Sequence, residues 1–319
     1  MKNAIAVIGQ GFVGGSLTTV FNERDTTCFV FDISKKVAPG GIDICAAMDL
    51  EGSRSVSAFV HLCEAKGYTS QISPETKFSG VYFVCLPTPM QEDGSCDVSI
   101  VEGTLSELAN CPGNRIAVVK STIPPGTTEA WNKKYENTGL RVIFNPEFLT
   151  EANALNDMRE QNRIVLGGPR PYINKVKQVF QAVFPNVPII KTSSTTAEMV
   201  KYVTNNFLTV KVAFANEISQ ICEALDAKGF DIDYDKVIEY AKYDTRLGES
   251  HWAVPGPDGH RGYGGSCFVK DLNAMMFVAK MLGIQSNVLD AAWMKNLEVR
   301  PEKDWEQLVG RAVTRTPKS

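Results

Sequence analysis

A cysteine behind a glycine-rich loop is the clearest candidate for covalent chemistry in this chain. The segment from Gly262 to Asp271 has the sequence Gly-Tyr-Gly-Gly-Ser-Cys-Phe-Val-Lys-Asp. Glycines let a backbone take positive φ and lie close to a ligand, and the apolar spacing that follows predicts a helix over 267–281. Cys267 then lies in the first turn, near Lys270 on the same helix face, where a thiol can act as a nucleophile.

The helix end is too weak to ionise this thiol by itself. A helix dipole contributes about 0.3–1 kcal/mol, whereas one pKa unit corresponds to about 1.36 kcal/mol. A thiolate near pH 7 therefore requires a neighbouring cation or base. The alternative is a buried structural cysteine, since free cysteine is among the most buried residue types.

The N-terminal segment predicts a dinucleotide site. Residues 4–8 form a continuous apolar run, typical of a buried parallel strand, and a G-x-G-x-x-G motif and a predicted helix follow directly. Asp32 ends the next strand, at the offset expected for a carboxylate that binds ribose. NAD is favoured over NADP because this carboxylate would repel a 2′-phosphate. The cofactor-binding residues predicted from the motif are Gly9, Gly11, Phe12, Val13, Gly14 and Asp32.

Short apolar strands alternate with helices up to about residue 190, which predicts an α/β fold with a doubly wound parallel sheet. Polar or proline-marked loops follow three strands, at 86–89, 120–126 and 145–151. Ligands bind at the carboxyl ends of parallel strands, so these loops are expected to line a site; proline turn chemistry is the simpler explanation of each loop alone. Residues 38–58 are irregular, with at most one short helix. The predicted strands are 4–8, 28–31, 81–85, 116–119, 142–144, 164–166 and 187–190, and the helices between them are 12–22, 99–109, 126–136 and 171–183.

One long helix is predicted over residues 195–228. Thr195 and Glu198 have the spacing of a capping box, and apolar residues recur at helical intervals after them. About 30 residues at 1.5 Å each span roughly 45 Å, so this helix is expected to link two domains or two subunits. Lys201 and Asn205 lie one turn apart beside the apolar stripe, where a solvated helix face is the alternative.

The pattern divides the chain into three parts. A Rossmann-type domain is predicted over 1–193, the long helix with a small all-helical dimerisation domain over 194–300, and a tail over 301–319. The tail from Arg311 onward is polar and is expected to be frayed. Two further helices are predicted, over 233–242 and 284–299.

Composition argues against several classes of function. A formal charge of −3 and a pI near 5.8 provide no basic patch for nucleic acid or an anionic membrane. The sequence contains no apolar run of 18 residues and no signal-peptide pattern, which predicts a cytosolic protein. Its eight cysteines lack C-x-x-C spacing and it has three histidines, so neither a disulfide framework nor a metal site is predicted.

These motifs, in this order from residue 1 to about residue 300, resemble the nucleotide-sugar 6-dehydrogenases, the UDP-glucose/GDP-mannose dehydrogenase family. The glycine-cysteine segment is the most specific part of the likeness. The resemblance implies two successive NAD-dependent oxidations of a sugar primary alcohol, through an aldehyde to a carboxylate, with a thiohemiacetal and then a thioester on the cysteine. UDP-glucose, oxidised to UDP-glucuronate, is the expected substrate. It also implies a homodimer built on the 195–228 helix.

The resemblance assigns roles by position. It implies that Cys267 is the nucleophile and that Lys201 and Asn205 stabilise the oxyanion at the sugar C6. Glu147 matches a carboxylate that helps deprotonate water, and Asp271 matches an acid that orders water or shares proton transfer with the lysine. The remaining matched positions are expected near the cofactor, at Thr88, Thr122, Glu151 and Lys270, or near the substrate, at Phe148, Leu149, Arg246, Tyr263 and Gly264.

Two of these positions have more specific roles in the family. Thr122 matches a hydroxyl that holds the hydrolytic water near the nicotinamide, and Arg246 matches an arginine that reaches across a dimer to the substrate diphosphate. Val269 departs from the family pattern, which usually has proline there. Family members also continue into a second nucleotide-binding domain that grips the base and ribose, so weak substrate binding is expected without it. Two alternatives stay open: a non-catalytic NAD-binding dimer module, and a two-electron hydroxyacid dehydrogenase of the wider superfamily.

Overall fold

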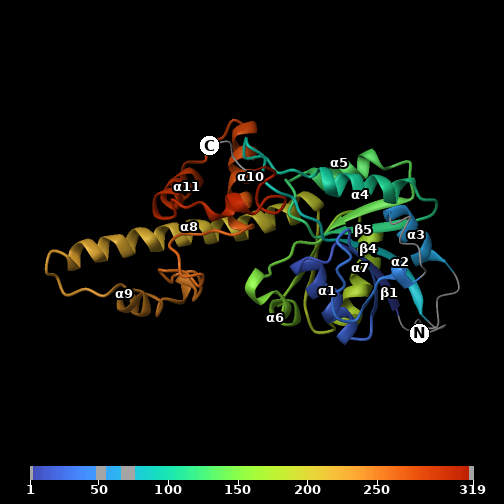
Figure 1. Ribbon diagram of the computed structural model, residues 1–319, viewed down its shortest axis with the longest axis horizontal. Helices are drawn as coiled ribbons and strands as arrows, with labels where there is room; N and C mark the ends of the chain where they lie inside the picture. The colour runs from blue at the N-terminus through green and yellow to red at the C-terminus, as the bar shows by residue number, and fades with distance from the viewer. Residues whose placement is uncertain (1–2, 48–54, 66–75, 316–319) are drawn as a thin grey trace. The chain divides into compact units, whose positions relative to one another are not determined.

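The computed structural model describes residues 3–47, 55–65 and 76–315 (Figure 1). The chain forms two compact units, and it passes from one to the other three times along its length. The first unit comprises 1–88 and 98–201, and the second comprises 89–97 and 202–319. The last crossing falls inside the long helix, whereas the sequence places the domain boundary just before that helix.

The first unit contains an eight-stranded sheet with the strand order β3-β2-β1-β4-β5-β6-β7-β8. Neighbouring strands are parallel except β6 and β7, which pair antiparallel. The predicted doubly wound α/β architecture is confirmed, and its sheet is parallel except at this one pair. The strands are β1 (Asn3–Ile8), β2 (Thr27–Phe31), β3 (Gly41–Ile42), β4 (Lys77–Val84), β5 (Arg115–Val119), β6 (Leu140–Phe144), β7 (Ile164–Gly167) and β8 (Ile189–Thr192).

Helices cover both faces of this sheet, because its strands are apolar on both sides. Along β1, Ala4, Ala6 and Ile8 pack into one core, with α2 to α5, while Ile5 and Val7 pack into the other, with α1, α6 and α7. The helices are α1 (Phe12–Glu23), α2 (Ile44–Ala47), α3 (Val56–Glu64), α4 (Ser99–Asn110), α5 (Thr127–Lys134), α6 (Ala154–Arg159) and α7 (Arg170–Val183). The short β3 and α2 and the start of α3 lie in the segment predicted to be irregular, of which residues 48–54 lie outside the described part.

The second unit is mainly helical. Its helices are α8 (Ser194–Asp226), which begins in the first unit, α9 (Tyr234–Ala241), α10 (Phe268–Met281) and α11 (Asn287–Val299), with 3-10 turns at Thr245–Leu247 and Asp304–Gln307. These bounds lie close to the predicted ones. None of the helices in the described residues combines the length and the apolar character that crossing a membrane requires.

The start of α8 differs from the predicted capping box. Ser193 Oγ accepts the backbone N–H of Thr196 at 3.2 Å. Glu198 instead extends to the N-terminus of α5, where its carboxylate accepts the N–H groups of Gly126 at 2.6 Å and Thr128 at 2.8 Å. The buried carboxylate therefore caps a second helix and ties the start of α8 to the first unit.

A hairpin from the segment between β4 and α4 belongs to the second unit. Met90 pairs with Cys96 across this hairpin and with Val313 near the end of the described chain. Met90 N donates to Ala312 O at 2.8 Å, and Thr314 N donates to Met90 O at 2.9 Å. The prediction of a frayed end from residue 311 is therefore wrong as far as residue 315, because backbone pairing and burial of Val313 hold this segment; residues 316–319 lie outside the described part.

Candidate active site

The loop between β1 and α1 has the shape that a dinucleotide phosphate requires. Gly9 has φ +90°, and a Cβ on Gly14 would overlap the Gly9 carbonyl, so both positions need glycine. A Cβ on Gly11 would meet open space, and no described side chain caps the first turn of α1. The N–H groups of that turn have no side-chain cap, and a helix N-terminus of this kind can bind the phosphates of a dinucleotide.

Asp32 lies directly after β2 and next to this loop. Its Oδ2 accepts the Gln10 N–H at 2.7 Å and its Oδ1 accepts the Ser34 N–H at 2.8 Å. The carboxylate is thus held beside the glycine motif, where a bound dinucleotide would place its ribose.

The predicted strand-end loops meet in the first unit. Ser121 Oγ donates to Leu86 O at 2.6 Å and accepts the Leu86 N–H at 3.0 Å. Thr88 Oγ1 donates to the carbonyl of Thr122 at 2.8 Å, and both threonines are buried. Glu151 is exposed at the start of a 3-10 turn, Glu151–Asn153. The structure therefore joins Thr88 to Thr122, and the cofactor contacts expected of all three remain predictions.

Glu147 and Lys201 form a buried ion pair. Lys201 Nζ lies 2.8 Å from Glu147 Oε1 and 2.8 Å from its backbone carbonyl, and the two side chains are 6% and 4% exposed. Burial alone would raise the pKa of Glu147, but the Lys201 ammonium and the Leu149 N–H outweigh it and lower that pKa. Phe148 lies under the Arg163 guanidinium, 4.0 Å from the ring centroid.

A third charged group in this cluster was not predicted. Lys120, at the end of β5, donates to Asn145 Oδ1 at 2.7 Å, and both residues are buried. Burial lowers the pKa of Lys120 to about 8, although Cys85 and Glu147 act against this change. The sequence marked this loop only by its prolines, since a lysine at a strand end carries no signal of burial.

Asp271 is the centre of the second unit's polar cluster. Its side chain is 1% exposed; Oδ2 accepts Asn205 Nδ2 at 2.5 Å and Oδ1 accepts Lys270 Nζ at 2.6 Å. Burial would lower the pKa of Lys270, but Asp271 and the thiols of Cys267 and Cys96 outweigh burial and raise it. The ammonium therefore stays charged beside the predicted nucleophile.

Cys267 lies at the N-cap of α10 and is partly exposed. The loop before it is held in place by Arg300, which forms ion pairs with Asp258 at 2.8 Å and Asp304 at 2.6 Å. A Cβ on Gly264 would overlap the Arg300 guanidinium, which explains a glycine at that position. This arginine was missed from the sequence.

Two predicted substrate residues lie in different surroundings. The Tyr263 side chain is buried in the core of the second unit and its hydroxyl donates to Ala292 O at 3.2 Å. Any substrate contact at this position would therefore come from the backbone. Arg246 is exposed and forms an ion pair with Asp244 two residues earlier, so the predicted contact with a diphosphate remains a prediction.

The predicted residues therefore gather in two clusters, one in each unit. The first holds the glycine motif, Asp32 and the Glu147–Lys201 pair, and the second holds Asn205, Asp271 and the thiol. Such groups can bind a dinucleotide phosphate, exchange protons and supply a nucleophile. A search of the described residues for three or more clustered His, Cys, Asp or Glu side chains finds no candidate metal site.

Comparison with known proteins identifies the family. Residues 3–185 match the NAD binding domain of the UDP-glucose/GDP-mannose dehydrogenase family, and residues 195–298 match its central domain. The chain belongs to this family. The match shows that the first unit is an NAD-binding domain.

Individual family members are similar along most of this chain. A putative UDP-glucose 6-dehydrogenase of Bacillus subtilis, YtcA, is 30% identical over 300 residues, which is 90% of this chain and 66% of the relative. The UDP-glucose 6-dehydrogenase AglM of Haloferax volcanii is 30% identical over 90% of this chain and 68% of its own length. This dehydrogenase-family chain thus spans about two thirds of the length of these relatives.

Solved structures show the same fold. A UDP-glucose dehydrogenase from Pyrobaculum islandicum superimposes with a TM-score of 0.74 and 26% identity, over 93% of this chain and 68% of that one. A 3-hydroxyisobutyrate dehydrogenase from Mycobacterium tuberculosis matches at 17% identity and a TM-score of 0.66, over 95% of this chain and 96% of that one. The second likeness shows the fold alone.

Proposed function

We propose that this chain carries the NAD-dependent oxidation of a nucleotide sugar at C6, from the primary alcohol through an aldehyde to the carboxylate. The observation that carries the proposal is a thiol at the start of α10 beside a buried Lys270–Asp271 pair. A two-electron alcohol dehydrogenase needs no such thiol. UDP-glucose is the proposed substrate, since the relatives named above are UDP-glucose 6-dehydrogenases.

NAD, when bound, would supply the hydride acceptor for each of the two oxidations. Gly9, Gly11 and Gly14, with Phe12 and Val13 in the first turn of α1, would hold its pyrophosphate, and Asp32 would hold the adenosine ribose. This assignment predicts faster turnover with NAD than with NADP at equal concentration. Equal or faster turnover with NADP would contradict the role of Asp32.

The first step removes the proton of the C6 hydroxyl group. Lys201 and Asn205 lie four residues apart on α8, and we propose that both donate to the oxygen at C6 as its proton passes to a water that Asp271 orders. Asp271 positions the Asn205 amide through their 2.5 Å hydrogen bond. In the next step the Cys267 thiolate attacks the aldehyde carbon, and the new oxyanion takes the same two donors.

Hydrolysis of the thioester requires an activated water. The lowered pKa of Glu147 keeps this carboxylate ionised near neutral pH, so it can accept a proton from that water, which Thr122 would hold. The C–S bond then breaks, and the thiolate leaves beside the Lys270 ammonium.

We also propose a homodimer built on α8. Five large apolar side chains on this helix are exposed, whereas Asn206, Thr209 and Asn216 are buried. The exposed residues are Met199, Val203, Phe207, Phe214 and Ile221. An apolar stripe left open to water favours association with a second copy. Replacing Phe214 and Ile218 with Glu is expected to yield monomers by sedimentation, and a wild-type monomer at micromolar concentration would contradict the proposal. A cytosolic location remains a prediction.

The test is the stoichiometry of NADH formation with UDP-glucose. Two NADH per uronate formed is the expected result. One NADH per sugar would indicate a two-electron dehydrogenase, and binding of NAD without turnover would indicate a non-catalytic module; either result contradicts the proposed function. A panel of other UDP- and GDP-sugars under the same conditions tests the substrate.

A further inference from the structure

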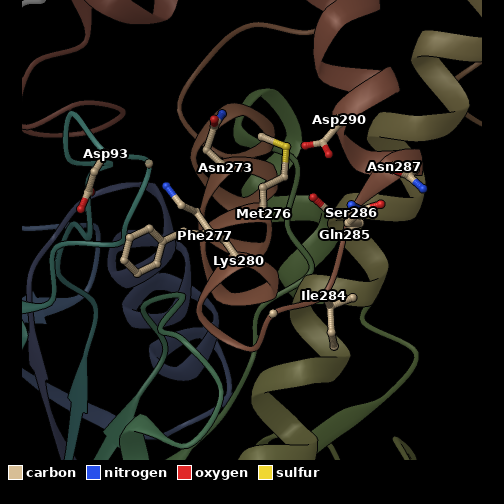
Figure 2. Close-up of a pocket in the computed structure, with 12 residues that line it drawn as sticks. Asp93, Asn273, Met276, Phe277, Lys280, Ile284, Gln285, Ser286, Asn287 and Asp290 are labelled. Carbon is tan, nitrogen blue, oxygen red and sulfur yellow. The ribbon is translucent and has the colours of Figure 1, made fainter.

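The second unit contains two neighbouring cavities beside the hairpin. The larger one has a volume of about 650 Å³, and most of its lining side chains are exposed and polar, such as Lys280 and Gln285 (Figure 2). The smaller one, about 500 Å³, shares Gly94 and Asn273 with it. A Cβ on Gly94 would lie 3.6 Å from the Asn273 carbonyl oxygen, so the hairpin turn lies against α10 where the two cavities meet.

Two tryptophans form the apolar wall of the smaller cavity. The ring centroids of Trp293 and Trp305 lie 5.5 Å apart, with an angle of 50° between the rings. Leu297, one turn after Trp293 on α11, and Met90 from the hairpin extend this wall. Trp293 is half-buried, so part of its side chain stays open to a ligand. Aromatic side chains of this kind bind planar rings by stacking.

The indole N–H of Trp305 has no hydrogen-bond acceptor in the described part of the chain, although the residue is 2% exposed. This N–H is also absent from the side-chain atoms of the described residues that are both unpaired and sealed from solvent. It therefore keeps contact with solvent, and the cavity is the opening that Trp305 lines. A ligand that enters must offer an acceptor there, because a donor left unpaired by its arrival costs free energy.

Charged groups of both signs surround the apolar wall. Lys303 and Arg315 contribute two cations, and Glu92 and Glu306 contribute two carboxylates, so the net formal charge of the lining is zero. Among the residues that the structure describes, none of these four side chains forms an ion pair. The lining therefore favours a ligand that presents both hydrogen-bond donors and acceptors.

The walls of the smaller cavity are held by contacts within the protein. Met90 is fixed by its two backbone hydrogen bonds to the C-terminal segment. Arg300 pairs with Asp304 at 2.6 Å, which ties the end of α11 to the 3-10 turn that carries Trp305. Small-molecule sites are usually pre-formed cavities of about 300–1,000 Å³, with apolar walls and a few polar groups. The smaller cavity has these properties.

We propose that this cavity binds a nucleobase, carried by a nucleoside or a nucleotide. A base matches each feature, since its ring stacks on Trp293, an acceptor on its edge takes the Trp305 N–H, and its other polar groups meet the charged side chains. An alkyl chain would leave those polar groups unmatched, and an aromatic acid would use the cations alone. The residues proposed above for NAD, substrate and catalysis do not line the cavity, so a bound base would leave them free.

The test labels the four tryptophans of the full chain with 5-fluorotryptophan and follows their ¹⁹F NMR signals. Trp131→Phe, Trp252→Phe and Trp293→Leu assign three signals, and the fourth belongs to Trp305. Titration with uridine, cytidine, adenosine and guanosine is expected to shift the Trp293 and Trp305 signals saturably with at least one nucleoside. Ribose, which lacks a base, and indole-3-acetate, an aromatic acid, should shift neither signal.

Two variants of the cavity wall make the test specific. Trp293→Leu removes the stacking ring and should weaken the nucleoside affinity, followed by the Trp305 signal, at least about fivefold. Thr314→Phe adds a ring to the half-buried wall and should weaken the affinity similarly, with the backbone bond to Met90 retained. Trp252→Phe, in the same unit but outside the cavity, is the matched control and should bind like the wild type.

Three results would overturn the proposal. These are unchanged Trp293 and Trp305 signals with all four nucleosides, an equal response to ribose or indole-3-acetate, and an unchanged affinity in both wall variants. The titration contains neither NAD nor a sugar nucleotide and reads signals at the cavity itself. Its outcome is therefore independent of the dehydrogenase activity proposed above.

Discussion

Each unit of this protein places a thiol, an ammonium and a carboxylate close together. In the first unit these groups belong to Cys85, Lys120 and Glu147, and in the second to Cys267, Lys270 and Asp271. The chemical types are the same, but the charges differ.

Burial controls the group in the first unit. It raises the pKa of Cys85 to about 12 and lowers the pKa of Lys120 to about 8, so each moves toward its neutral form. The reason is the choice of partner: Glu147 bonds Lys201, and Lys120 is left with the neutral Asn145 carbonyl. An ammonium that can lose its proton gives a thiolate little support.

Charge pairing controls the group in the second unit. Lys270 Nζ lies 2.6 Å from Asp271. This carboxylate and the neighbouring thiols together keep the pKa of Lys270 raised despite burial. Cys85 and Cys267 are both partly exposed residues, but burial raises the pKa of the Cys85 thiol. We therefore expect a lysine to activate a neighbouring cysteine where a carboxylate holds the lysine charged.

Replacing each thiol in turn is expected to give the largest difference in activity between the two groups. Cys267→Ala is expected to lower uronate formation by at least about 1000-fold, because the covalent step is lost. Cys85→Ala, the matched control, should keep its rate and lose only stability, about 1 kcal/mol. Turnover with NAD and UDP-glucose measures the activity of both variants. Equal losses of activity would contradict the contrast between the two groups.

Removing each ammonium should give a smaller difference. Lys270→Met is expected to slow alkylation of Cys267 by iodoacetamide roughly 10- to 100-fold at pH 7, because a nearby cation favours the thiolate by about one to two pKa units. Lys280→Met, on the same helix but exposed, should leave the rate within about twofold of the wild type. Peptide mass spectrometry reports the rate at this one sulfur, and an unchanged rate in Lys270→Met would remove the proposed role of the ammonium.

The smallest expected effect is on stability in alkali. The pKa of Lys120 is about 8 in the folded protein against 10.5 ordinarily, so between these values the unfolded chain binds more protons and the free energy of unfolding rises with pH. This contribution, about 1 to 2 kcal/mol between pH 8 and 10, should disappear in Lys120→Met and persist in Lys133→Met, an exposed control. Urea unfolding at the two pH values measures it; identical pH slopes in all three proteins would show that Lys120 titrates normally.

Local patterns predicted the elements and their order. Continuous apolar runs marked the strands, and the glycine motif, Asp32 and the glycine-cysteine segment marked both clusters, because each is written in neighbouring residues. Strand direction leaves no trace in an apolar run, so the antiparallel pairing of β6 with β7 was missed. Glu198 was assigned to its own helix because spacing cannot show that α5 offers nearer N–H groups.

Motifs and the family resemblance pointed to individual residues of the candidate site, but not to how their side chains pair. Glu147 with Lys201 and Asn205 with Asp271 are brought together only by tertiary folding. Cys96 carried no signal, since a single cysteine without a spaced partner resembles any other. Lys270, whose pKa Cys96 helps to raise, is distant in sequence.

The pairing of Met90 also has a consequence for synthesis of the chain. Its backbone partners, Ala312 and Thr314, follow it by about 220 residues. At about 5–20 residues per second, a ribosome makes that length in roughly 10 to 45 s. The hairpin therefore leaves the ribosome long before α10 and the C-terminal segment exist to receive it, and during this interval its edge is available to chaperones and its cysteine to small thiols. An early segment of the chain thus completes its fold last.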